Sequence, residues 1–255
     1  WLNSSAATRF GVTGPLLREE DCFAVVAALD DVPAEVLDGW VADAGRAAAA
    51  RGVVGVVDLE MTWNIDNWLR RMAAGFDTLR VRSGIYPQFL DRAIAAGYRT
   101  GTELGPLLHV GPFKIITDGS LNTRTAFCVD PYPGMGDYRG LLTVQPHDLV
   151  EWLARAEAFT PAVHAIGDAA NHLALDAFES LGVTGRIEHA QLVSDDDFAR
   201  FAELGVIASV QPEHAMDDRD VAERYWAGRT GRGYALASLH DAGATLLLGS
   251  DAPVA

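Results

Sequence analysis

Four short apolar runs of the sequence each carry a side chain that can bind a metal ion. These side chains are Lys114, His164, His189 and Asp251, and the runs that contain them cover residues 113–119, 162–168, 186–190 and 246–253. Side chains at the carboxyl ends of successive strands in an α/β barrel converge on one mouth of the barrel. Together the four runs therefore predict a metal centre.

The two histidines each end a predicted strand, where an imidazole nitrogen is a ligand that zinc prefers. A single histidine on an apolar strand is more often a hydrogen-bonded core residue. Two histidines on neighbouring strands favour a metal site over two core residues. Adjacent parallel strands lie about 4.8 Å apart, so both rings can reach one ion at about 2.1 Å. Asp251 has two interpretations: it caps the next helix, or it is a ligand that also carries a proton for a bound water.

Lys114 lies inside an apolar strand, where a charged amine has a large desolvation cost unless it is neutralised or paired. One interpretation is an ion pair with a carboxylate such as Asp118 or Asp168. The other is that the amine, deprotonated by burial, reacts with carbon dioxide to give a carbamate. The carbamate would turn a cation into a carboxylate-like bridging ligand.

Short runs rich in Val, Ile and Leu alternate with amphipathic segments along the chain. The runs are apolar on both faces, as is typical of parallel strands covered by helices. They predict seven strands, at residues 53–59, 79–86, 113–117, 162–166, 185–189, 206–211 and 245–250. Helices are predicted at residues 36–51, 63–76, 90–96, 146–159, 169–181, 195–204 and 234–242. Residues 118–144 and 212–233 are predicted to be long connections on the C-terminal side of their strands, where barrel enzymes build substrate pockets.

Composition limits the classes of partner. The 255 residues are 49% hydrophobic and carry a formal net charge of −15, which argues against nucleic acid or an anionic membrane as a partner. No apolar stretch is long enough to span a bilayer, and no basic leader is present. Cys22 and Cys128 are isolated, so we expect a reduced, cytoplasmic setting. The expected partner is a small-molecule substrate, and a homodimer is left open.

Five ordered motifs resemble the amidohydrolase superfamily. They are KIITDGSLNTRTA from Lys114, HAIGD from His164, IEHA from Ile187, SVQPEH from Ser209 and GSDAPV from Gly249. The branch they resemble most is amidohydrolase family 3, which includes N-substituted formamide deformylases, and residues 1–6 and 13–16 resemble it too.

The resemblance implies an α/β fold, a (β/α)₈ TIM barrel of the metal-dependent hydrolase type. One or two divalent ions, zinc by expectation, would hydrolyse a C–N bond of an amide, formamide or cyclic amide, other than a peptide bond. The implied ligands are a carboxylated lysine on strand four, a histidine on each of strands five and six, and an aspartate on strand eight. They correspond to Lys114, His164, His189 and Asp251.

The sequence also departs from the family pattern. Relatives carry a His-x-His pair on the first barrel strand, whereas no two histidines of this chain stand two apart. We therefore expect residues 1–255 to be a partial TIM-barrel catalytic domain with strands two to eight. The first strand, the small β domain and the part after strand eight would then be absent. An open barrel of this kind exposes two strand edges.

The implied mechanism is hydrolysis by a metal-activated hydroxide, with Asp251 taking a proton from the water and passing it to the leaving nitrogen. Arg124 is a candidate clamp for a polar group of the substrate, or a solvated loop arginine. His214 is a candidate for stabilising the oxyanion, or an exposed loop histidine. Asp168 is expected to cap the helix that follows it, or to orient His164.

Two other classes of protein compete with the hydrolase. A doubly wound nucleotide-binding protein would share the alternation of strands and helices, but the sequence has neither GxGxxG nor a P-loop after any strand. The stronger rival is a non-catalytic or incomplete amidohydrolase-like barrel that binds at most one metal, because the His-x-His pair is missing.

Overall fold

The computed structural model describes residues 2–14, 17, 20–29 and 32–252. The chain forms two compact units. The first extends to Val54 and includes Gly75–Leu79, and the second comprises Gly55–Ala74 and the chain from Arg80 onward. The single domain expected over residues 1–255 stays a prediction.

The first unit is helical, with α1 (Ser4–Phe10), α2 (Glu20–Leu29) and α3 (Ala34–Ala50). Helix α3 corresponds to the helix predicted at 36–51. It packs on the segment 75–79, since a Cβ added at Gly45 would lie 2.9 Å from the Phe76 ring. Helices α1 and α2 were not predicted.

The second unit contains a sheet with strand order β1–β2–β4–β5–β6–β7–β8, and all neighbours in this order are parallel. The bounds are β1 (Gly55–Asp58), β2 (Arg80–Ile85), β4 (Leu108–Ile116), β5 (Pro161–Ala165), β6 (Arg186–His189), β7 (Ile207–Val210) and β8 (Leu246–Leu248). These are the seven predicted strands. The short strand β3 (Glu103–Gly105), which pairs antiparallel with β4, was not predicted.

Strand β4 begins five residues before its predicted start. The predicted strand began only after Gly111 and Pro112, two residues that usually interrupt a strand. In the structure the register with β2 shifts at this pair. A Cβ at Gly111 would lie 2.9 Å from the backbone of Gly84, so glycine allows the close approach of the two strands.

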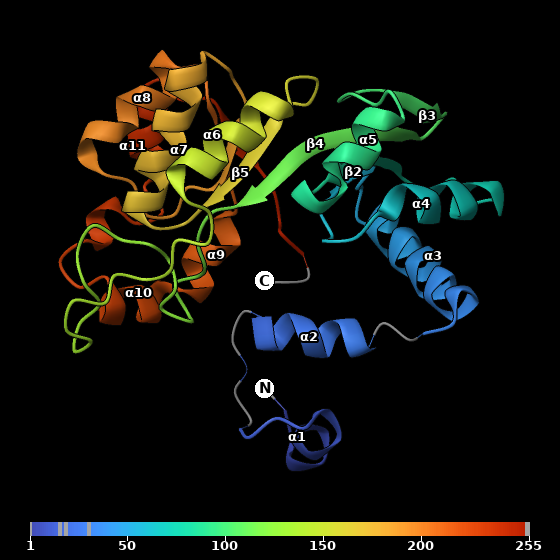
Figure 1. The fold of residues 1–255 in the computed structure, drawn as a ribbon, viewed down its shortest axis with the longest axis horizontal. Coiled ribbons are helices and arrows are strands. Elements are labelled where there is room, and N and C mark those ends of the chain that lie inside the picture. Colours follow the sequence, from blue (N-terminus) through green and yellow to red (C-terminus); the bar gives the residue numbers. More distant parts are fainter. Residues whose placement is uncertain (1, 15–16, 18–19, 30–31, 253–255) are drawn as a thin grey trace. The chain divides into compact units, whose positions relative to one another are not determined.

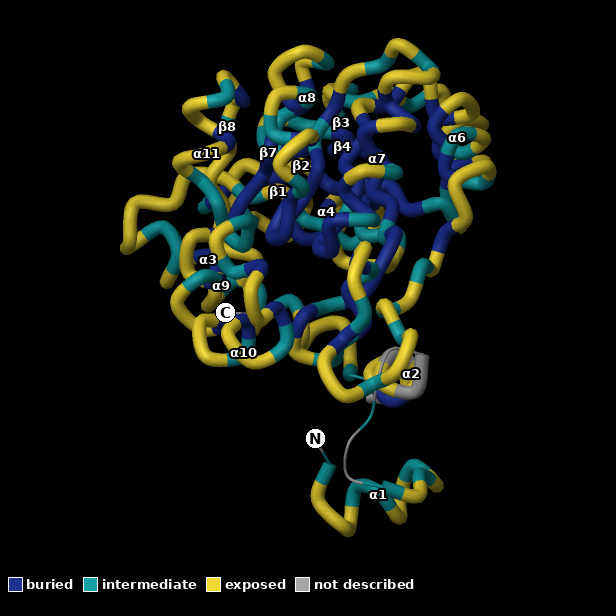
Figure 2. The backbone as a smooth tube through the Cα atoms, turned by 90° about the vertical axis from the view of Figure 1, so that its left-hand side faces the viewer, coloured by how far each residue is buried: buried dark blue, intermediate teal, exposed yellow. Residues whose placement is uncertain are grey.

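Helices follow the strands and cover the sheet (Figure 1). They are α4 (Asn64–Ala73), α5 (Leu90–Ala95), α6 (Pro146–Arg155), α7 (Asp168–Leu181), α8 (Phe198–Glu203) and α11 (Leu236–Asp241). Buried residues concentrate on the strands and on the helix faces that meet them (Figure 2). Within the described part of the chain, no helix is both long enough and apolar enough to cross a bilayer.

The two long connections lie at the carboxyl ends of β4 and β7. Residues 118–144 contain no helix, whereas residues 212–233 form α9 (Pro212–Asp217) and α10 (Arg219–Tyr225), two helices that were not predicted. The two segments lie side by side (Figure 1). Asn122 Nδ2 donates to Asp218 Oδ1 at 2.5 Å, and a second core cluster that includes Leu121, Tyr132 and Trp226 joins them.

Seven parallel strands that alternate with covering helices define an α/β fold, an incomplete (β/α)₈ barrel. Strands β1 and β8 each pair with one strand among the described residues, so the sheet is open between them. The predicted ligands lie near the carboxyl ends of β4, β5 and β6 or, for Asp251, after β8, at the edge of the sheet where the two long connections follow β4 and β7. This edge is where the site is built.

Candidate metal centre

Lys114 and His164 share one face of the sheet. Lys114 pairs in register with Ala162, and Ile116 pairs with His164, so His164 lies two residues nearer the carboxyl edge. His164 in turn pairs with Glu188 on β6. Because side chains alternate between the faces of a strand, Lys114, His164 and Glu188 all lie on the same face.

His189 reaches this group by leaving the regular strand. Strict alternation would place it on the face opposite to Glu188, but His189 has φ +79° and the next residue, Ala190, has φ +42°. Positive φ is uncommon for residues other than glycine and turns the chain sharply. The ring centroids of His164 and His189 are 4.5 Å apart, with an angle of 71° between the planes. The structure thus brings these two predicted ligands together.

His214 and Asp251 complete the cluster. His214 lies on α9, directly after β7, and its ring stacks on that of His189. Asp251 follows β8, and its Oδ2 is 3.6 Å from His214 Nε2. One ligand atom from each of His189, His214 and Asp251 lies within 4.8 Å of the other two. Two imidazoles and a carboxylate are donors suited to a divalent transition-metal ion.

Burial and neighbouring charges set the protonation of these groups. Burial lowers the pKa of His189 well below its usual range, and its neighbours His164 and Lys114 lower it further. The neutral imidazole is the form that binds a metal. Burial raises the pKa of Asp251, while His214, Lys114 and His164 oppose this shift.

Lys114 is buried, and burial lowers the pKa of its amine to about 8, against the opposing effect of Glu188 and Asp251. The predicted pairing with Asp118 or Asp168 is wrong. Asp118 instead accepts backbone N–H bonds from Ile166, Gly167 and Phe127 at 2.9 to 3.0 Å. Asp168 accepts from Val129 N at 2.8 Å and from Arg232.

His164 is oriented by Asp118, and the prediction that Asp168 orients it is wrong. His164 Nε2 lies 3.4 Å from Asp118 Oδ1 and 3.4 Å from the carbonyl of Gly119. The predicted capping role of Asp168 is also wrong, because the N-cap of α7 is Gly167 and no side chain caps the helix; Asp168 is its first residue and accepts from the N–H of Ala169.

Arg124 lies on the connection 118–144, with φ +61° and its guanidinium 5.4 Å from the centre of the Tyr225 ring. It therefore takes part in the contact between the two long connections. No hydrogen bond or ion pair joins it to the histidines or to Asp251 among the described residues. Its predicted role as a substrate clamp stays a prediction.

Sequence reasoning missed two glutamines. Gln211 lies 2.9 Å from Nδ1 of His189 through its Oε1, and Gln191 lies 3.1 Å from Nδ1 of His214 through its Nε2. Both side chains are buried. The sequence offered a weak signal for each, because they follow the strands that end at His189 and Val210.

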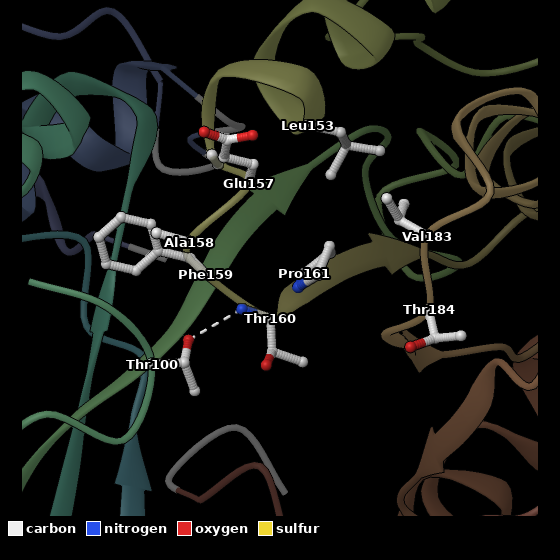
Figure 3. A pocket seen from close by; sticks show the side chains of 10 residues that line it. Thr100, Leu153, Glu157, Ala158, Phe159, Thr160, Pro161, Val183 and Thr184 are labelled. Atoms are coloured by element: carbon white, nitrogen blue, oxygen red, sulfur yellow. Dashed lines mark hydrogen bonds between the residues drawn. The ribbon is translucent and has the colours of Figure 1, made fainter.

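A pocket of about 240 Å³ lies at the opposite end of β5 (Figure 3). Its lining includes Thr100, Phe159 and Thr184, and Thr160 N donates to Thr100 Oγ1 at 2.8 Å. The active sites of α/β barrels lie at the carboxyl ends of the strands, whereas the amino ends serve stability. We therefore assign the candidate site to the histidine cluster and not to this pocket.

Comparison with known proteins identifies the class. The chain matches the amidohydrolase family over residues 7–255, so it belongs to that family. The fold is an incomplete TIM barrel of the metal-dependent hydrolase type. It is similar to an uncharacterized metal-dependent hydrolase of Pyrococcus horikoshii OT3, with a TM-score of 0.86, 27% identity, and coverage of 99% of this chain and 54% of that chain.

Two further proteins are similar to this chain. An uncharacterized metal-dependent hydrolase of Pyrococcus furiosus has a TM-score of 0.83 and 27% identity, with coverage of 99% of this chain and 56% of that one. Protein LONG AFTER FAR-RED 3 of Arabidopsis thaliana is 30% identical over 89% of this chain and 45% of its own length. The chain spans about half the length of these relatives.

The family implies a divalent metal, and the residues present fit one. Two imidazoles and a carboxylate converge, and His214 Nε2 is buried with no hydrogen-bond partner among the described residues. A buried polar atom without a partner costs free energy unless something binds it.

Proposed function

We propose that the protein is a zinc-dependent hydrolase of a C–N bond in an amide, formamide or cyclic amide, other than a peptide bond, and that Lys114, His164, His189 and Asp251 hold the metal. The observation that carries the proposal is that the rings of His164 and His189 lie 4.5 Å apart and that one ligand atom from each of His189, His214 and Asp251 lies within 4.8 Å of the other two. The expected substrate is a small molecule, and the expected setting is the cytoplasm.

A bound divalent ion would lower the pKa of a water molecule and polarise the substrate carbonyl. The residues of the chain would handle the protons. Asp251, ionised at the start of the cycle, would accept a proton from the attacking water and pass it to the leaving nitrogen. Burial raises the pKa of its carboxyl group, which favours holding that proton between the two steps.

Carboxylation of Lys114 belongs to the proposal. The neutral amine would attack carbon dioxide, form an N–C bond and release one proton, leaving an anionic carbamate. The lowered pKa of about 8 supports this reaction, because a larger share of the amine is neutral near pH 7. Lys114 is the single lysine of the 255 residues, so a lysine carbamate detected by ¹³C NMR in ¹³C-bicarbonate can be assigned through its loss in Lys114→Met.

Two more residues belong to the proposed site. Arg124 would bind a polar group of the substrate, from the connection that covers the mouth. His214 would face the reacting carbonyl or the metal. Which of these it faces depends on which ring nitrogen carries its proton.

The experiment uses the whole protein. Metal content is measured by mass spectrometry, and hydrolysis is followed by the release of amine from N-formyl and N-acyl compounds and cyclic amides. We expect near-stoichiometric zinc and hydrolysis, with hydrolysis lost in His164→Asn and Asp251→Asn. His240→Asn is the matched control, because His240 is 77% exposed and lies on α11.

A non-catalytic relative that binds at most one metal is the second candidate. The absence of any His-x-His pair from the 255 residues favours it. Protein that binds no metal when zinc is supplied at near-stoichiometric amounts, and hydrolyses none of these compounds, would support this candidate against the enzyme.

A further inference from the structure

His214 has two ring nitrogens in different surroundings. Its Nδ1 lies 3.1 Å from the side-chain amide of Gln191, and its Nε2 is buried, without a hydrogen-bond partner among the described residues, 3.6 Å from Asp251 Oδ2. In the neutral ring one nitrogen carries a proton and the other a lone pair. A proton on Nε2 would suit an oxyanion donor, whereas a lone pair on Nε2 would suit a metal ligand.

Tyr234 determines which end of the Gln191 side-chain amide donates a hydrogen bond and which end accepts one. The Tyr234 hydroxyl contacts Asp218 Oδ2 and also lies 3.2 Å from the oxygen end of the Gln191 amide. It has one proton, and a bond to an ionised carboxylate is the stronger use of that proton. Asp218 already accepts from Asn122 through its other oxygen, as a carboxylate does. The hydroxyl oxygen therefore offers only lone pairs to Gln191.

The end of the amide that faces Tyr234 must then donate. A half turn of the Gln191 amide about its Cγ–Cδ bond meets this requirement, because it exchanges the oxygen and the NH₂ group and moves no other group. In that orientation the amide oxygen faces His214 Nδ1, which must carry the proton. The lone pair of His214 is then on Nε2, which lies beside Asp251.

His189 is held in the same way. Gln211 Nε2 lies 3.3 Å from the carbonyl oxygen of Ser209, which can only accept, so Gln211 Oε1 faces His189 Nδ1 at 2.9 Å and accepts a hydrogen bond from its N–H. The lone pair of His189 is therefore also on Nε2. Metal-binding histidines commonly donate their second ring N–H to an oxygen in this manner.

We propose that His214 is itself a metal ligand through Nε2, in one centre with His189 and Asp251, and that Gln191 is its positioning residue, fixed by Tyr234. The inference rests on the proposed function and extends it. It replaces the oxyanion role predicted for His214, because the two roles need opposite tautomers of the neutral ring.

The test measures zinc affinity in the whole protein, by competition with a chromophoric chelator. His214→Ala should weaken binding strongly, and Gln191→Leu should weaken it about 10- to 100-fold. Gln191→Glu should keep most of the affinity, because a carboxylate also accepts a hydrogen bond from the Nδ1–H group. His240→Ala is the matched histidine control, and circular dichroism checks that each variant is folded.

Two results would overturn the inference. One is unchanged zinc affinity in folded His214→Ala, with kcat lost, which would identify an oxyanion donor and leave the proposed function intact. The other is a ¹⁵N-histidine NMR spectrum of the metal-free protein that shows the proton of His214 on Nε2. If the unchanged protein binds no zinc, the proposed function fails and the inference fails with it.

Discussion

The rings of His189 and His214 lie nearly parallel, with centroids 5.9 Å apart and planes 9° apart. His189 ends β6, and His214 lies two residues after Pro212, which begins α9 at the end of the neighbouring strand β7. Proline fits the first turn of a helix because its fixed φ is already helical and its missing N–H is not needed there. The stacking therefore follows from an early helix start next to a strand that ends in histidine.

The first prediction concerns Asp251. It has φ +55°, a conformation that asparagine also tolerates, so Asp251→Asn should keep the backbone while removing the charge. Zinc at 100 times its Kd should raise the free energy of unfolding of the unchanged protein by about 2.7 kcal/mol. If the variant binds zinc tenfold more weakly, the same zinc concentration should give about 1.4 kcal/mol. Urea unfolding with and without zinc measures both values, and equal zinc effects in the two proteins would count against a ligand role.

The sequence predicted the seven strands because each is a short apolar run, and it predicted the site because metal-binding side chains lie within four of these runs or directly after them. Lys114, His164 and Asp251 stand out by this contrast alone. The runs also indicate parallel strands, since amphipathic segments lie between them. What could be predicted was therefore local in the chain.

The missed features are those that need a partner from elsewhere in the chain. Gln191 and Gln211 have no distinctive sequence context. Their role follows only from the histidine rings to which they are hydrogen-bonded. Asp118 could not be separated from Asp168 as the neighbour of His164, because both closely follow a strand. The positive φ of His189 also had no local signal, since positive φ is uncommon for any residue other than glycine.

The second prediction concerns Gly167, which joins β5 to α7. A Cβ at Gly167 would lie 2.0 Å from the carbonyl oxygen of Phe127 and would push the connection 118–144 away from the helix. Gly167→Ala should lower the free energy of unfolding by about 1–3 kcal/mol, the usual cost of overpacking. Gly231→Ala is the control, because a Cβ there would have no described atom within 4 Å and the φ of Gly231 lies outside the left-handed region. Equal urea midpoints for the two variants would contradict the close packing.

The third prediction concerns Cys128, in the core cluster between the two long connections. It is 1% exposed, and burial raises the pKa of its thiol to about 11, so little thiolate forms at pH 8. Cys22 is exposed. A thiol reagent at pH 8 should modify Cys22 rapidly and Cys128 only in urea. Cys22→Ser isolates the slow site, and fast labelling of this variant in buffer would show that the cluster opens readily.

The last prediction gives the sign of a pH effect. In the metal-free protein, burial lowers the pKa of Lys114 from 10.5 to about 8. Below pH 8 the amine is protonated in both the folded and the unfolded states, and the folded state bears the full cost of desolvation. Between pH 8 and 10.5 the folded state releases its proton first, so the free energy of unfolding rises with pH.

Lys114→Met should lack this rise. At about 1.4 kcal/mol for each unit of pKa difference, the unchanged protein should gain about 3 kcal/mol relative to the variant between pH 7 and 10.5. Urea unfolding in chelator-treated buffer free of carbon dioxide measures this difference. Parallel stability curves would mean that the amine keeps its charge in the folded state, which would also remove the physical support for its carboxylation, because only the neutral amine attacks carbon dioxide.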